Sequence, residues 1–120
     1  MSKRILIVDD EEPLRRSLVR VLGRPGFQIN AYGCSEDALS GLELEPQLIV
    51  CDYHLPRIDG ISVLRAARVR CPGVKTILLS GGVCDDAITA ALEEGIVDSF
   101  FIKPWRLDEL LAAVDELCGR

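Results

Sequence analysis

Five short apolar runs alternate along this chain with five longer segments of mixed polarity. Such runs are typical of strands buried in a sheet, and apolar residues spaced three and four apart in the longer segments are typical of amphipathic helices. A helix between two strands makes a crossover, so we predict an α/β fold with parallel strands and helices on both faces of the sheet. The predicted strands are residues 3–8, 27–32, 48–51, 74–79 and 99–102.

Turn and cap residues mark where the helices should begin and end. We expect Ser35 to cap the second helix and Asp59 to open the third. In the fourth and fifth helices the apolar spacing places Leu92 and Leu107 among the inward-facing residues. Gly95 is predicted to end the fourth helix in a left-handed conformation.

Length and charge limit the classes of function. A chain of 120 residues with 48% hydrophobic residues fits one domain, residues 1–120. The formal net charge of -5 disfavours direct binding of nucleic acid, which normally requires clustered Lys and Arg. No apolar run reaches a membrane-spanning length, and the five cysteines include no CxxC pair. We therefore expect a cytoplasmic domain with free thiols and no membrane insertion.

The segment 48–60 contains a predicted strand that is buried on both faces of the sheet. Its apolar run has no charge until Asp52, and turn residues such as Pro56 follow before the next helix. Asp52 is therefore expected at the carboxyl end of a buried strand. In open α/β sheets this edge is where ligands bind.

Polar residues also follow three other predicted strands. Asp9 and Asp10 come after the first, Ser80 after the fourth and Lys103 after the fifth. If the strands are parallel, these groups lie at one edge with Asp52. Clustered carboxylates repel one another unless a cation binds, so Asp9, Asp10 and Asp52 are a candidate Mg²⁺ site. A phosphoryl group could then lie between the cation and Lys103, near the Ser80 hydroxyl, with Asp52 as nucleophile.

Each of these residues also has a simpler interpretation. Asp10 could cap the first helix, Ser80 could belong to a turn, and Lys103 could be only an ion-pair partner of Asp52. These interpretations do not explain why complementary groups end four strands at the same edge.

Four segments together resemble the receiver domain of response regulators, of the chemotaxis-regulator type, over essentially the whole chain. They are ILIVDDEE, LIVCDYHLPRIDG, ILLSG and FFIKPW, in the order and near the spacing of that family. The resemblance implies a flavodoxin-like sheet in the order 2-1-3-4-5, an order that is known for this family. It also implies a signalling domain, not an enzyme with turnover, that takes a phosphoryl group from a histidine kinase or a histidine phosphotransfer protein.

The resemblance assigns a role to each matching residue. Asp52 would be the phosphoacceptor, and the Mg²⁺ ligands would be Asp9, Asp10, Asp52 and the backbone carbonyl of His54. Ser80 would be the switch hydroxyl, Phe100 the aromatic switch, and Lys103 the lysine that faces the phosphate. Phosphorylation would then change the surface made by the fourth helix, the fifth strand and the fifth helix, where an output domain, a partner or a second copy could bind.

Two other functions remain open at this stage. A Mg²⁺-dependent phosphatase of the haloacid dehalogenase type also forms an aspartyl phosphate, but it carries an Asp-x-Asp pattern where this chain has His54. A pseudo-receiver would only act as a scaffold, which the complete set of acidic residues, Ser80 and Lys103 argues against. The last helix lacks the basic pattern familiar from regulators fused to winged-helix DNA-binding domains, so we expect that output less than others.

Overall fold

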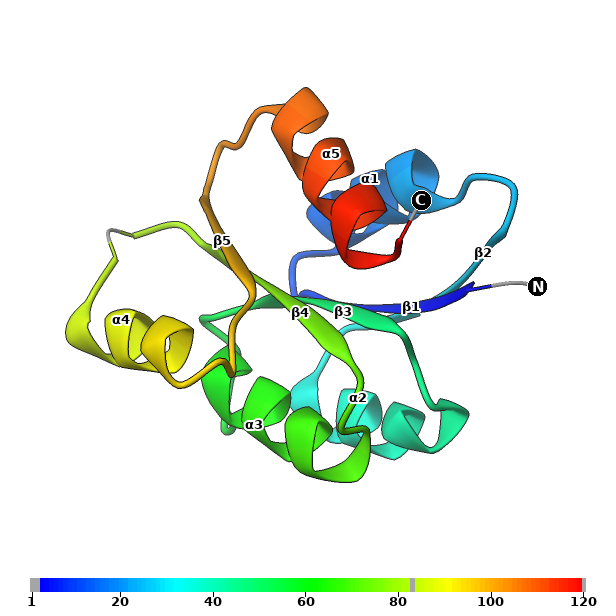
Figure 1. Cartoon of the computed structure of the whole chain (residues 1–120). Helices are drawn as coiled ribbons and strands as arrows, with labels where there is room; N and C mark the ends of the chain where they lie inside the picture. The colour runs from blue at the N-terminus through cyan, green and yellow to red at the C-terminus, as the bar shows by residue number, and fades with distance from the viewer. Residues whose placement is uncertain (1–2, 83, 120) are drawn as a thin grey trace.

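The computed structural model describes residues 3–82 and 84–119, in which five strands alternate with five α-helices (Figure 1). The strands are β1 (Lys3–Val8), β2 (Phe27–Tyr32), β3 (Leu48–Asp52), β4 (Lys75–Ser80) and β5 (Ser99–Ile102). The helices are α1 (Glu12–Leu22), α2 (Ser35–Gly41), α3 (Gly60–Arg70), α4 (Asp86–Glu93) and α5 (Leu107–Leu117), with a 3₁₀ turn at Leu42–Leu44 after α2.

The strands form one parallel sheet in the order β2-β1-β3-β4-β5. The predicted fold class and strand order are therefore confirmed. Every residue of β3, the central strand, is buried, as expected for an apolar run covered on both faces. β2 is an edge strand with only partly buried and exposed residues, which explains its alternating pattern.

Two layers of apolar side chains cover the two faces of the sheet. Alternate strand residues point to opposite faces, so Ile5 and Ile7 of β1 pack with α1 and α5, whereas Leu6 and Val8 pack with α2, α3 and α4. Figure 1 shows the same division of the helices between the two faces. Each fully buried Leu or Ile side chain contributes about 1.5–3 kcal/mol to folding. The core therefore holds the strand ends in fixed positions at one edge.

Three expectations about side chains are corrected. Ser35 does not cap α2 with its side chain; it is buried, and its hydroxyl donates to the carbonyl of Ile58 over 2.6 Å. The contact joins α2 to the loop before α3, a tertiary bond that local sequence does not reveal. Leu92 and Leu107 are exposed, because the buried face of α4 is carried by Ile88 and Ala91 and that of α5 by Leu110 and Val114.

Other helix boundaries follow the predicted signals. The Asp59 side chain caps α3 by accepting from the backbone N–H of Ser62 over 2.8 Å. Gly95, just after α4, has a positive φ of 78°, a conformation that glycine adopts with little strain. Among the described residues, no helix is long and apolar enough to cross a bilayer.

Candidate functional site

The carboxyl edge of the sheet brings the predicted site residues together. In β3 and β4, Asp52 pairs with Leu79, and Ser80 follows as the last residue of β4. The backbone N–H of Lys103 donates to the carbonyl of Ser80 over 2.8 Å, which places Lys103 directly beyond β5. Asp9 follows β1, the other neighbour of β3. The strand register alone therefore places these four residues at one edge.

Lys103 faces the carboxylates across this edge. Its Nζ lies 3.2 Å from Asp52 Oδ1 and 3.6 Å from Asp9 Oδ2. Lys103 is thus an ion-pair partner of both buried oxygens, and neither oxygen has a well-formed hydrogen bond among the described residues. Buried carboxylate oxygens without a hydrogen bond are costly, so each can accept a further partner besides Lys103.

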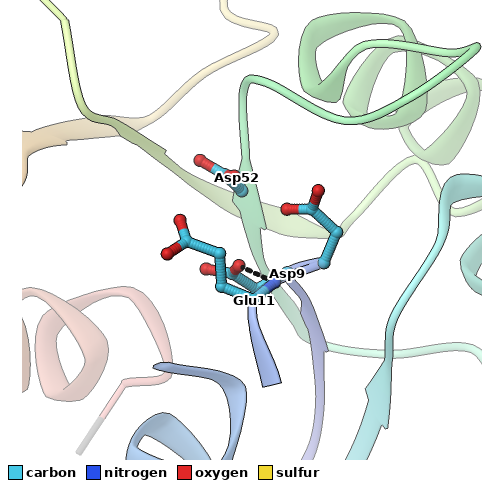
Figure 2. Close-up of side chains that lie close together, drawn as sticks. Asp9, Glu11 and Asp52 are labelled. Carbon is cyan, nitrogen blue, oxygen red and sulfur yellow. Dashed lines mark hydrogen bonds between the residues drawn. The ribbon is translucent and has the colours of Figure 1, made fainter. Parts of the chain in front are cut away.

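Glu11 is a fourth member of the acidic cluster, with no role predicted from the sequence. One carboxylate oxygen from each of Asp9, Asp10, Glu11 and Asp52 lies within 4.8 Å of the other three. Figure 2 shows Asp9 and Glu11 beside the end of β3, with Asp52 across from them, and the dashed hydrogen bond from the Glu11 backbone N–H to Asp9 Oδ1, which measures 2.9 Å. The run of consecutive acidic residues after β1 was the sequence feature that could have indicated a role for Glu11.

Burial and neighbouring charges shift the pKa values of the groups in this site. Asp9 and Asp52 are both buried, and loss of hydration raises the pKa of each carboxyl above its ordinary value even though Lys103 acts in the opposite direction. Burial acts to lower the pKa of Lys103, but the Asp9, Asp52 and Glu11 carboxylates outweigh it and leave that pKa raised. The site therefore favours a charged lysine and has negative charge that one ammonium does not fully compensate.

The residues present fit a hard divalent cation. The cluster offers oxygen ligands, and the orphaned Asp9 and Asp52 oxygens gain a partner when a cation binds. Mg²⁺ retains several waters, so it needs few protein carboxylates and an accessible side. Asp10 and Glu11 are exposed and leave such a side.

The other predicted residues surround this centre. Ser80 is buried, and its Oγ accepts from the backbone N–H of Gly82 over 3.1 Å. Phe100 is partly buried against the core layer on the α3 and α4 side of the sheet. His54 is exposed in the loop after β3, and its ring lies 4.8 Å from that of Tyr53, centre to centre. The side chain of His54 thus lies on the surface and not in the buried part of the site.

Neutralising Asp9 is expected to stabilise the protein in the absence of metal. The raised pKa of Asp9 means that its charged form opposes folding above that pKa, and this opposition disappears as the pH falls through it. At pH 7, Asp9→Asn should therefore raise the melting temperature by a few degrees. The difference between the variant and the wild type should shrink at acidic pH. Mg²⁺ should raise the melting temperature of the wild type more than that of Asp9→Asn, because the wild type keeps the Asp9 carboxylate as a Mg²⁺ ligand.

Thermal melts with and without Mg²⁺ measure this effect. Glu116→Gln on the exposed surface of α5 is the control, since it removes the same charge away from the cluster. Equal melting temperatures for wild type and Asp9→Asn without metal would show that the buried charge does not oppose folding.

Comparisons with known proteins agree with this geometry. Residues 5–115 match the family model described as the response regulator receiver domain. The chain is 38% identical over 120 residues to the transcriptional regulatory protein PrrA of Mycobacterium tuberculosis, with 99% of this chain and 51% of that protein covered. It therefore spans about half the length of the curated relatives it matches.

Two solved structures are similar over most of the chain. The BeF₃-activated DrrB receiver domain has a TM-score of 0.88 at 26% identity and covers 100% of both chains. A response regulator from Burkholderia pseudomallei with a phosphorylated aspartic acid, calcium ion and citrate has a TM-score of 0.81 at 26% identity, covering 93% of this chain and 66% of that one.

These relatives bear on the functions left open by the sequence. They give no support to a phosphatase or a pseudo-receiver. Relatives at 36% identity are named DNA-binding response regulators, so they give no support to the expectation that a DNA-binding output is less favoured than others. The match to the family model covers most of the chain, so this protein belongs to the response regulator receiver domain family and is a signalling domain of the two-component type.

Proposed function

We propose that Asp52 is the phosphoacceptor and that residues 1–120 act as one phosphoacceptor domain. The observation that carries the proposal is the buried Asp52 carboxylate at the carboxyl end of the central strand, whose Oδ1 lies 3.2 Å from the Lys103 ammonium. In the proposed step, an Asp52 carboxylate oxygen attacks phosphorus, the phosphorus–nitrogen bond of a phosphohistidine breaks, and the imidazole leaves with the bonding electrons. Burial raises the pKa of the Asp52 carboxyl, and Lys103 acts in the opposite direction by favouring the charged, nucleophilic form.

Mg²⁺ is the proposed cofactor. Asp9, Asp10 and Asp52 of the acidic cluster would hold it. The family resemblance adds the backbone carbonyl of His54 as a further ligand. When bound, the cation supplies positive charge to the oxygens of the transferring group. Lys103 would contact one phosphoryl oxygen and the Ser80 hydroxyl another, so the protein provides donors on the side away from the cation.

The proposed output is a change of surface and not catalytic turnover. Any activity would be limited to the domain's own phosphorylation and dephosphorylation. A phosphoryl group would add acceptor oxygens at the strand edge that Ser80 shares with Asp52. The Ser80 hydroxyl would move inward to reach one of them, and Phe100 would then turn toward the space left behind. The affected surface, formed by α4, β5 and α5, carries the exposed apolar side chains of Leu92, Ile102 and Leu107.

The proposed partners follow from the family. A histidine kinase or a histidine phosphotransfer protein would supply the phosphoryl group, and an output domain, a separate partner or a second copy would bind the α4-β5-α5 surface. PrrA is named a transcriptional regulatory protein, so a DNA-binding output in a longer protein is one candidate. We propose no direct nucleic-acid contact for the described domain because its formal net charge is -5. Its cytoplasmic location stays a prediction.

Incubation with acetyl phosphate and Mg²⁺ tests the proposed function. A phosphoacceptor switch should accumulate one base-labile phosphoryl group per chain, measured by intact-protein mass spectrometry. A phosphatase would instead release phosphate continuously, and a scaffold would show neither result. Absence of labelling at saturating Mg²⁺ and donor would contradict the proposal.

Ser80→Ala is expected to leave phosphorylation of Asp52 intact and to reduce, but not abolish, the surface change that follows it. Switching a population from 1:99 to 99:1 requires about 5.5 kcal/mol, whereas one hydrogen bond to a charged group contributes about 1.5–3 kcal/mol. The variant should therefore accept phosphate at Asp52 but show a reduced shift of the Phe100 and Trp105 NMR signals with beryllofluoride and Mg²⁺. A full wild-type shift would mean that the coupling runs through Lys103 or the loop after Asp52.

A further inference from the structure

The ammonium of Lys103 is shared by three carboxylates, and one of them has no place in the proposed phosphoryl chemistry. Besides Asp52 and Asp9, Nζ lies 3.5 Å from Glu11 Oε1. Whereas the Asp9 and Asp52 side chains are buried, the Glu11 side chain is 65% exposed. Glu11 thus contacts the lysine from the more exposed side of the site.

The backbone fixes the position from which Glu11 reaches Lys103. Its N–H donates to Asp9 Oδ1, and its carbonyl accepts from the N–H of Arg15 over 2.9 Å in the first turn of α1. Arg15 also donates from its guanidinium to the carbonyl of Asp9 over 2.8 Å. Only the side chain of Glu11 therefore has freedom to move.

The next residue in the chain has a different partner. The Glu12 carboxylate lies 2.6 Å from the guanidinium of Arg16, one turn along α1, and both side chains are largely exposed. Two consecutive glutamates thus differ in whether they contact the site. The contact between Glu11 and Lys103 is a property of that position and not of the general negative charge after β1.

We propose that Glu11 is a positioning residue that holds the Lys103 ammonium toward the outer side of the site and competes with an anion on Asp52 for it. This inference rests on the proposed phosphoacceptor function. An ammonium has three donors, and three carboxylates already surround that of Lys103. A phosphoryl group at Asp52 adds oxygens that need Lys103, so this lysine must weaken its contact with Glu11 to engage them fully.

The competition should show as a change in anion affinity. Exposed ion pairs contribute little, so removal of the Glu11 charge should tighten beryllofluoride binding at saturating Mg²⁺ by about threefold. Glu11 acts through Lys103 and does not itself bind the anion. It would therefore set how strongly the phosphorylated state is favoured without being required for phosphorylation.

The test compares Glu11→Gln, Glu11→Asp and Glu12→Gln by NMR titration with beryllofluoride at saturating Mg²⁺. Glu11→Gln removes the charge, and Glu11→Asp keeps the charge but shortens the side chain so that it no longer reaches Lys103. Both should bind beryllofluoride about threefold more tightly than wild type, whereas Glu12→Gln should not differ from wild type. Wild-type affinity for Glu11→Asp, or equal effects of Glu11→Gln and Glu12→Gln, would overturn the proposal in favour of general charge.

A second measurement reads the lysine directly in the resting protein. The ¹⁵Nζ resonance of Lys103 should shift in both Glu11 variants without beryllofluoride and stay unchanged in Glu12→Gln. An unshifted resonance in the Glu11 variants would also overturn the proposal. If the wild type failed to bind beryllofluoride or to accept phosphate, the phosphoacceptor function would fail, while the resonance would still report whether Glu11 holds Lys103.

Discussion

Asp52→Ala is expected to abolish labelling by acetyl phosphate while leaving the fold intact. Asp52 is the acidic residue that ends the central strand, and Lys103 lies 3.2 Å from its Oδ1. Phosphoryl transfer needs both a nucleophilic oxygen and a positive group beside it, and alanine removes the oxygen. Loss of a buried carboxylate that opposes folding should not lower the stability of the metal-free protein. Mass spectrometry should show no phosphoryl adduct, and circular dichroism should show a wild-type spectrum.

Asp59→Ala is the matched control, because Asp59 lies in the same loop region but caps α3 and does not face Lys103. It should keep full labelling and lose about 1 kcal/mol of stability with the cap. Labelling of Asp52→Ala at one phosphoryl group per chain would mean that another residue is the acceptor.

The sequence predicts those features of the fold that depend on strand pattern. Apolar runs that end on polar residues predict parallel strands, and parallel strands bring Asp9, Asp52, Ser80 and Lys103 to one edge whatever the details of packing. The strand order itself came from the family resemblance, because apolar runs alone do not determine which strands are neighbours. The backbone bond between Lys103 and Ser80 shows how directly the site follows from the register.

Features that depend on side-chain contacts between distant parts of the chain were not predicted. Glu11 joins the site because its side chain extends over Lys103, and spacing in the sequence does not reveal that direction. Ser35 was expected to cap α2 because serine is common at that position. Its hydroxyl instead donates to the Ile58 carbonyl, in a buried contact that satisfies both polar groups. Leu92 and Leu107 match the apolar spacing of their helices, yet only part of each helix face is covered by the sheet.

Gly60 lies where the chain turns from the phosphoacceptor strand into α3. Its N–H donates to the Tyr53 carbonyl over 2.9 Å, so the start of the helix is bonded to the residue after Asp52. A Cβ at this position would lie 2.1 Å from the Asp52 carbonyl oxygen and 2.9 Å from Tyr53 Cα. Both neighbours are backbone atoms, which cannot rotate away as the end of a side chain could. The missing side chain of Gly60 thus allows the loop to close against the acceptor residue.

Gly60→Ala is therefore expected to destabilise the protein by about 2–4 kcal/mol, the range of severe overpacking, although alanine normally favours a helix over glycine. The shift needed to admit the methyl group falls on the backbone of Asp52, so labelling by acetyl phosphate should slow as well. Gly73→Ala is the matched control: no atom lies within 4 Å of its added Cβ, so its stability should change by no more than about 0.5 kcal/mol. Urea unfolding of both variants gives the free energies of unfolding, and labelling rates measured below the unfolding transition report on the site. If Gly60→Ala unfolded at the same urea concentration as Gly73→Ala, the close approach of α3 to Asp52 would not be a constraint on this fold.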